Sequence, residues 1–272
     1  MLFLVSTPIG NLSDITYRAI DILNSSDYVL CEDTRHSLVL LNHYKIKKKL
    51  IAFHLFTEKS LEEQIIHDLK AGKQISLISD GGTPGISDPG EKLVKRCREE
   101  NIPVSAAPGA CALITALSIS GFPTAPFQFI GFFERKETSL KKQLVNILQY
   151  QGTTIGYESP KRILSTVQLL ASIAPDCTIS IARELTKKFE SFLKGSSIEL
   201  SSQIKSEICK GEITLIIQGN QSCENEFNDL SPKEHVEQLM QSYKISEKEA
   251  VKLAAELRGV PKKLVYKSYH ID

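Results

Sequence analysis

The feature that most constrains this fold is a regular alternation of short apolar runs and helical stretches over the first 120 residues. The apolar runs, which we predict to be strands, cover residues 2–6, 28–32, 50–54, 74–79 and 103–108. They are nearly continuous in apolar residues, as expected of strands covered on both faces of a sheet. The alternation therefore predicts an open, mainly parallel α/β sheet.

Local signals predict where several helices begin and end. One helix is expected to begin at Ser60, because Glu63 three residues later completes a capping box. Another is expected to have Asp88 as its N-cap and Pro89 as its first residue. A third should end at Gly121.

The pattern changes after residue 121, where strands outnumber helices. Predicted strands cover residues 127–133, 153–158, 178–184, 189–195 and 212–219, and predicted helices cover 137–150 and 161–174. The third and fourth strands are so close in sequence that a hairpin should join them, which makes this second sheet mixed.

We therefore expect an N-terminal α/β lobe over residues 1–120, a C-terminal lobe with a mixed sheet over 121–222, and a small helical tail over 228–272. The segment 121–127, rich in Gly and Pro, is the expected hinge, and 220–232 reads as a polar linker. The tail resembles a helix–turn–helix and is basic. It is interpreted either as a solvated docking element or as a contact for RNA or DNA.

Composition excludes several classes of protein. A net charge of +1, with 42% hydrophobic and 24% charged residues, is unlike a disordered chain and gives no global preference for nucleic acid. The six cysteines form no CxxC pair, so we expect no metal site. The N-terminus reads as a strand rather than a signal peptide, and no apolar run is long enough to cross a membrane, so we expect a cytoplasmic protein.

The sequence "DGGTPGISDPG", residues 80–90, follows the fourth predicted strand. In open α/β sheets ligands bind beyond the carboxyl ends of strands. The glycines allow a close backbone approach, whereas the loop contains neither lysine nor arginine. It matches no Walker loop, and no GxGxxG follows the first strand. The loop is therefore expected to bind a ligand that contains no polyphosphate group.

Two charged clusters follow other strands. "EDTRH", residues 32–36, is expected to stay extended, which would place Glu32 and Thr34 on one side and Asp33 and Arg35 on the other. "ARELTKK", residues 182–188, lies at the end of a strand in the second half. For each cluster, a role in binding substrate and a purely local ion pair remain alternatives.

Six ordered motifs closely resemble those of the ribosomal RNA small subunit methyltransferase I family, a group of tetrapyrrole-methylase-like enzymes. The motifs are "TPIGNLSDIT" (7–16), "CEDTRHS" (31–37), "SDGGTPGISDPG" (79–90), "APGACALITALSISGFP" (107–123), "YESPKRI" (157–163) and "ARELTKKFE" (182–190). The resemblance implies two α/β lobes with S-adenosylmethionine in the cleft between them, a homodimer, and 2′-O-methylation of a cytidine in the decoding region of 16S rRNA within the small ribosomal subunit.

The resemblance also implies site residues. Those expected to bind the cofactor are Pro8, Gly10, Gly82, Thr83, Gly85, Ile86, Ser87, Ala110, Cys111, Ala112, Tyr157, Glu158, Ala182, Ile213 and Thr214. Because a ribose hydroxyl is a poor nucleophile, a base is expected as well. Its candidates are Asp33 and Glu184, which we favour, and Glu32, with phosphates bound by Arg35, Arg183 and Lys187.

Two alternatives remain open at this point. A tetrapyrrole C-methyltransferase shares the cofactor site but has no evident use for a basic tail. A non-catalytic ribosome-assembly factor would keep the fold as an RNA-binding platform and need not bind the cofactor.

Overall fold

The computed structural model describes residues 1–54, 57–204, 210–219, 230–243 and 245–270. The chain divides into two compact units. The first consists of Met1–Gly121 with Ala182–Phe192 and Glu212–Thr214. The second consists of Phe122–Ile181, Leu193–Gly211 and Leu215–Asp272. Most of the predicted linker 220–232, together with Cys209, Cys223 and Lys244, lies outside the described residues.

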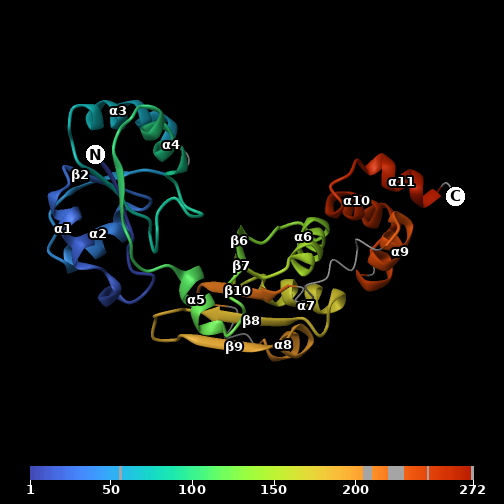
Figure 1. The fold of residues 1–272 in the computed structure, drawn as a ribbon. Helices are drawn as coiled ribbons and strands as arrows, with labels where there is room; N and C mark the ends of the chain where they lie inside the picture. The colour runs from blue at the N-terminus through green and yellow to red at the C-terminus, as the bar shows by residue number, and fades with distance from the viewer. Residues whose placement is uncertain (55–56, 205–209, 220–229, 244, 271–272) are drawn as a thin grey trace. The chain divides into compact units, whose positions relative to one another are not determined.

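The first unit contains the predicted parallel sheet (Figure 1). Its strands are β1 (Leu2–Val5), β2 (Tyr28–Cys31), β3 (Lys49–Ala52), β4 (Ile75–Leu77) and β5 (Val104–Ala107). Their spatial order is β3-β2-β4-β1-β5, and every pairing is parallel. All five carboxyl ends therefore lie along one edge, which brings the loops that follow them together.

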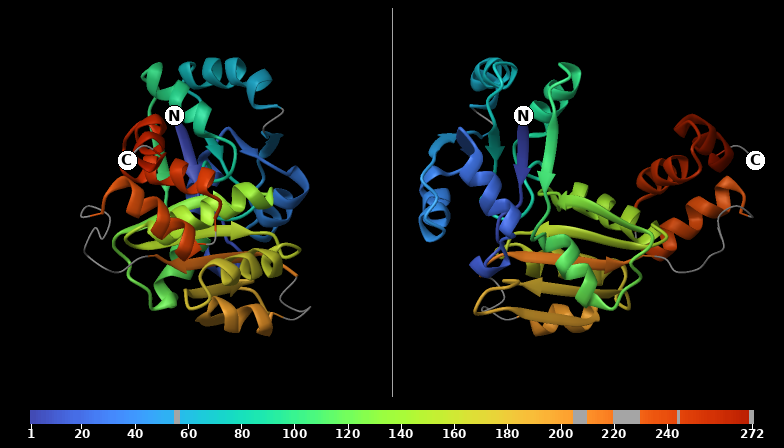
Figure 2. Two further views of the ribbon diagram at one scale, coloured as in Figure 1. Left: turned by 90° about the vertical axis from the view of Figure 1, so that its right-hand side faces the viewer. Right: turned by 60° about the vertical axis from the view of Figure 1, so that its left-hand side comes forward.

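Helices cover both faces of this sheet (Figures 1 and 2). They are α1 (Tyr17–Ser25), α2 (Thr34–His43), α3 (Glu58–Lys70) and α4 (Glu91–Glu99). The unit also contains α5 (Ala112–Ser120) and a short 3₁₀ turn at Leu12–Asp14. Leu2, Leu30 and Leu77 point toward α3 and α4, whereas Val5 and Val29 point toward α1 and α2. Alternate strand residues thus fill two apolar layers, which explains the continuous apolar runs of the sequence.

Two predicted helix starts are wrong. Helix α3 begins at Glu58, and Ser60 lies inside it, where its hydroxyl donates to the Thr57 carbonyl at 2.9 Å. Helix α4 begins at Glu91 after Gly90, whose φ of 130° is accessible mainly to glycine, so Asp88 is not its N-cap. The predicted end of α5 is confirmed, because Gly121 adopts the left-handed conformation there.

The mixed sheet, in the order β6-β7-β10-β8-β9, belongs mostly to the second unit (Figure 1), while Ala182–Arg183 of β8, Ser191–Phe192 of β9 and Ile213–Thr214 of β10 belong to the first. The strands of this sheet, with the helices that lie between them in the chain, are β6 (Phe127–Phe132), α6 (Glu137–Gln149), β7 (Thr153–Glu158), α7 (Ile163–Ile173), β8 (Thr178–Arg183), β9 (Ser191–Ser196), α8 (Ser197–Gln203) and β10 (Ile213–Gln218). Strands β6 and β7 are parallel, and β8 and β9 are neighbours joined by a short connection, which is the predicted hairpin. Helix α8, with its Ser196–Glu199 capping box, was not predicted.

The tail forms α9 (Pro232–Tyr243), α10 (Glu247–Leu257) and α11 (Lys262–His270). The predicted signal at Ser246 is present, since its backbone N–H and its hydroxyl both donate to the Glu249 carboxylate. Buried His235 accepts a hydrogen bond at its Nδ1 from Arg258, which ties α9 to the end of α10. Among the described residues, no helix has the length and apolar character that crossing a membrane requires.

Candidate cofactor site at the carboxyl edge of the first sheet

The glycine loop after β4 is bonded to the loop after β1. The backbones of Thr7 and Gly82 exchange two hydrogen bonds, at 2.9 and 3.0 Å. The hydroxyl groups of Ser6 and Thr83 lie 2.9 Å apart. The loop therefore has a defined conformation, and it holds the predicted residues Gly82 and Thr83 beside the segment that contains Pro8 and Gly10.

The conformation of this loop depends on its glycines. Gly82 and Gly85 have φ of 89° and 81°, and Ser87 has φ of 64°. A Cβ on Gly82 would lie 3.4 Å from Ile9 Cγ2 and 3.8 Å from the Ala110 carbonyl oxygen. The loops after β1, β4 and β5 therefore converge at Gly82, as the sequence predicts. Ala110 and Cys111 lead directly into the N-terminus of α5, which begins at Ala112.

Acidic side chains dominate the charge near this loop. Burial, together with the negative charge of Asp80, raises the pKa of Glu32. Burial and the charges of Glu32 and Asp80 raise the pKa of Asp88 to about 6. No lysine or arginine belongs to the loop 80–90 itself. The carboxyl edge of the first sheet therefore favours binding of a ligand that carries positive charge and disfavours binding of a polyphosphate.

Asp33 has the extended backbone expected for it, but the extended run ends there. It is the N-cap of α2, and its carboxylate accepts a hydrogen bond from the Arg35 N–H at 2.8 Å. The Arg35 guanidinium also donates to both of its oxygens, at 3.1 and 2.7 Å. The predicted alternation is wrong because Thr34 already starts a helix. The hydrogen bonds from Arg35 hold the pKa of Asp33 well below its usual range, so this carboxylate has little affinity for a proton.

The Glu184 carboxylate is also held by a cation and by a backbone N–H. Its Oε1 accepts from Lys187 Nζ at 3.0 Å and from the Glu212 N–H at 2.9 Å, and Lys187 also pairs with Glu212 at 2.9 Å. Burial would raise the pKa of Glu184, but the Glu212 amide and the Lys187 ammonium outweigh it and lower that pKa. Lys187 lies so close to Gly10 that a Cβ there would be 2.3 Å from its Cγ. The carboxylate is thus held as an anion in a compact cluster.

The other residues of the first unit that the sequence predicts for the site differ in exposure. Ala182, Ile213 and Thr214 are buried, so a ligand would meet chiefly their backbone groups. Arg183 donates from its guanidinium to the Phe189 carbonyl at 3.2 Å. Ile86, in contrast, is 46% exposed on the glycine loop.

Tyr157 and Glu158 belong to the second unit. Tyr157 packs edge-on against Phe129 and Phe132, with ring centroids 5.0 and 5.7 Å apart. Glu158 is buried and accepts hydrogen bonds from the Ser159 N–H and the Thr166 hydroxyl. It also pairs with Arg162 at 3.3 Å. These contacts give Glu158 a structural role at the start of α7.

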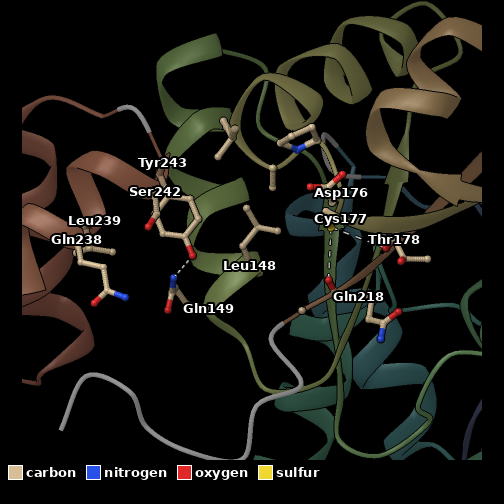
Figure 3. A pocket seen from close by; sticks show the side chains of 14 residues that line it. Leu148, Gln149, Asp176, Cys177, Thr178, Gln218, Gln238, Leu239, Ser242 and Tyr243 are labelled. Atoms are coloured by element: carbon tan, nitrogen blue, oxygen red, sulfur yellow. Dashed lines mark hydrogen bonds between the residues drawn. The ribbon is translucent and has the colours of Figure 1, made fainter. Parts of the chain in front are cut away.

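The second unit also contains a pocket of about 500 Å³ beside the tail (Figure 3). Helix α9 contributes Gln238, Leu239, Ser242 and Tyr243, while Leu148 and Gln149 come from α6 (Figure 3). The Gln149 amide donates to the Tyr243 hydroxyl across it. None of the residues predicted to bind cofactor or catalyse the reaction lines this pocket.

Sequence comparison identifies the family. The tetrapyrrole (corrin/porphyrin) methylase family model matches residues 1–201. The ribosomal RNA small subunit methyltransferase I of Halalkalibacterium halodurans is 42% identical, with 99% of this chain and 94% of that protein covered. The protein of the same name from Bacillus subtilis is also 42% identical, with 100% of this chain and 94% of that protein covered. The chain belongs to the ribosomal RNA small subunit methyltransferase I family of tetrapyrrole methylases. It is a methyltransferase.

Solved structures share the fold of this family. Diphthine synthase aligns with a TM-score of 0.62 at 10% identity, over 80% of this chain and 89% of that one. The uroporphyrin-III-C-methyltransferase of Thermus thermophilus aligns with a TM-score of 0.55 at 18% identity, over 79% and 93%. These likenesses establish the two-lobed architecture with a parallel N-terminal and a mixed C-terminal sheet.

Asp80 and Asp88 are not among the residues that the sequence predicts for the site. Both stand in the glycine loop as acidic side chains, but the capping signal at Asp88 and Pro89 suggested a structural role. The effect of Asp80 on the pKa of Glu32 follows from the order β2-β4 in the sheet, which places the ends of these two strands side by side. Among the described residues, no three His, Cys, Asp or Glu side chains converge in a way that would hold a metal ion.

Proposed function

We propose that this enzyme transfers a methyl group from S-adenosylmethionine to the ribose 2′-hydroxyl of a cytidine in 16S rRNA of the small ribosomal subunit. The observation that carries the proposal is the match, at 42% identity and nearly full length, to proteins named ribosomal RNA small subunit methyltransferase I. The 2′-hydroxyl and the cytidine come from the resemblance of the six motifs described above.

The chemistry of the glycine loop fits this cofactor. S-adenosylmethionine carries a sulfonium and an ammonium group and has no phosphate. Gly82, whose own N–H and C=O are bonded to Thr7, allows a close approach. Backbone groups of Thr83 and Gly85 offer hydrogen bonds there, and Asp80 and Asp88 supply negative charge. The amino end of α5, after Ala110 and Cys111, offers free N–H groups suited to a carboxylate. A related C-methyltransferase of this fold has been solved in complex with S-adenosyl homocysteine.

Among the three candidate bases, the contacts favour Glu32. Asp33 and Glu184 are each held as anions by a cation and a backbone N–H, so accepting a proton would disrupt those contacts. The pKa of Glu32 is raised instead, and a general base works best when its pKa approaches the working pH. When bound, the cofactor supplies an electrophilic methyl group. Glu32 would accept the hydroxyl proton as that oxygen attacks.

The basic surfaces are proposed to bind RNA phosphates. Helix α11 buries only Val265, and Lys262, Lys263 and Lys267 are exposed on it beside Tyr266. Arg35, Arg183 and Lys187 remain candidates at the first unit. Phosphate contacts give affinity without sequence preference, so specificity would come from the shape of the ribosomal particle. This substrate implies a cytoplasmic enzyme. A homodimer is also part of the proposal, and light scattering tests it.

The decisive test of the function is to map ribose methylation in small-subunit rRNA from cells with and without the gene. We expect one cytidine to lose its 2′-O-methyl group in the deletion strain and to regain it when the gene is restored. Restoration by the Glu32→Gln variant should fail. An unchanged methylation map in the deletion strain would contradict the proposed function.

A further inference from the structure

The connection between β8 and β9 exposes an aromatic side chain among charged residues. Phe189 is 65% exposed, and Lys188 Nζ lies 5.7 Å from the centroid of its ring. Lys188 and Glu190 on either side are exposed as well. Single exposed apolar side chains are common on protein surfaces, so a binding role for Phe189 must rest on the cation beside its ring and on the loop that presents it.

The loop that carries Phe189 is held by a dense set of contacts. Arg183 donates to the Phe189 carbonyl at 3.2 Å, and the Thr186 N–H donates to the Glu190 carboxylate at 2.5 Å. The side chain of Leu185 in this loop is buried, which helps to fix the loop. The ring is therefore presented in a fixed position, which lowers the entropy that binding would cost.

The backbone of the same loop is strained. Glu184 and Thr186 have φ of 52° and 67°. Positive φ is unfavourable for residues other than glycine, and most of all for a β-branched residue such as Thr186. The Asn11 N–H donates to the Thr186 hydroxyl at 3.1 Å, which helps to hold that conformation. Such strain gathers at functional sites, because elsewhere a less costly residue would serve.

We propose that Phe189 and Lys188 form a stacking platform for one nucleobase of single-stranded RNA next to the methylated ribose. This inference rests on the proposed function. The 65% exposure of the ring leaves area for a base, and Lys188, whose Nζ lies 5.7 Å from the ring centroid, would pair with the neighbouring phosphate. Aromatic rings beside cations are the usual means of binding single strands. A lone ring flanked by charges is too small for the apolar centre of a protein–protein interface.

The sequence supplies a direct probe, because the chain contains no tryptophan. The Phe189→Trp variant would carry a single fluorophore at the platform. Titration with an oligocytidylate of about ten nucleotides, within the usual site sizes for single strands, should quench its emission in a saturable, salt-sensitive way. Tyr17→Trp is the matched control, since Tyr17 is 91% exposed on α1 and should respond little. Equal responses, or quenching that follows protein concentration rather than RNA, would overturn the platform.

Kinetics separate this inference from the proposed function. Phe189→Ala should weaken RNA binding by about 5- to 100-fold and raise KM for the ribosomal particle, while Phe189→Tyr should stay near wild type. Affinity for S-adenosylmethionine should not change in either variant. If the wild type methylates rRNA and Phe189→Ala keeps its KM, the platform is wrong and the function stands. If the wild type does not methylate rRNA, the function itself fails, whatever the fluorescence shows.

Discussion

Two loops of the first unit depart from ordinary backbone geometry, and they do so with opposite chemistry. The loop 80–90 reaches positive φ mostly with glycines and carries acidic side chains but no cation. The loop 184–190 reaches positive φ at Glu184 and Thr186 and carries two lysines, two glutamates and an exposed phenylalanine, with Lys187 paired to Glu184. We propose the first loop for a small, positively charged cofactor and the second, through Lys188 and Phe189, for one base and phosphate of RNA. The two proposals thus assign cofactor and RNA recognition to loops of different composition.

The largest expected effect concerns the acid beside the glycine loop. Glu32→Gln should lower kcat by about 10²- to 10⁴-fold, because the amide cannot accept the hydroxyl proton. Binding of S-adenosylmethionine should be nearly unaffected, which calorimetry can check. Asp33→Asn is the comparison: it weakens a cap and an ion pair but removes no base, so its kcat should fall much less. Equal losses in both variants would mean that Glu32 has no special role.

The next effect tests the conformation of the glycine loop. Gly82→Val should weaken cofactor binding by about 100-fold, because the side chain meets Ile9 and misplaces the backbone groups that hold the ligand. Gly72→Val is the matched control, since Gly72 also has φ of 89° but has nothing within 4 Å of its Cβ position. Both should lower the melting temperature through backbone strain. Comparable cofactor affinity in the two variants would contradict the assigned site.

A smaller effect follows from Asp88, whose pKa is raised to about 6 by burial and by Glu32 and Asp80. A carboxyl group whose pKa is raised by folding stabilises the protein at low pH, and that contribution is lost as pH rises through about 6. Asp88→Asn should therefore gain thermal stability relative to the wild type between about pH 4 and 7. Wild-type affinity for a positively charged cofactor should rise over the same interval and that of the variant should not. Parallel pH profiles would contradict this.

The smallest expected effect lies on the other loop. Lys188→Ala should reduce the slope of log affinity for single-stranded RNA against log salt by about 0.7, the value for one phosphate contact. Lys95→Ala on α4, which is also exposed, should leave that slope unchanged. Cofactor affinity should be the same in both. A lower slope in the Lys95 variant as well would show only a general electrostatic effect.

The strands could be predicted to within a few residues because both layers of the first sheet are continuous in apolar residues. The helix starts were less predictable, because Thr57 rather than Ser60 precedes the first residue of α3 and Gly90 rather than Asp88 precedes that of α4. At the site, the glycine loops were visible in the sequence, since few other residues reach positive φ. Local ion pairs such as Asp33–Arg35 and Glu184–Lys187 were one of the alternatives for the two charged clusters. The N-cap role of Asp33 and the hydrogen bond from Glu212, 28 residues away from Glu184, were not visible, because they depend on where α2 starts and on the sheet.

The central claim is that the glycine-lined edge of the first unit binds a phosphate-free, positively charged cofactor. Isothermal titration of the wild type with S-adenosylmethionine, and separately with ATP, tests it most directly. We predict one saturable S-adenosylmethionine site per chain, weakened by about 100-fold in Gly82→Val and kept in Gly72→Val, with no competition by ATP. Tighter binding of ATP at the same site, or no binding of S-adenosylmethionine, would contradict it.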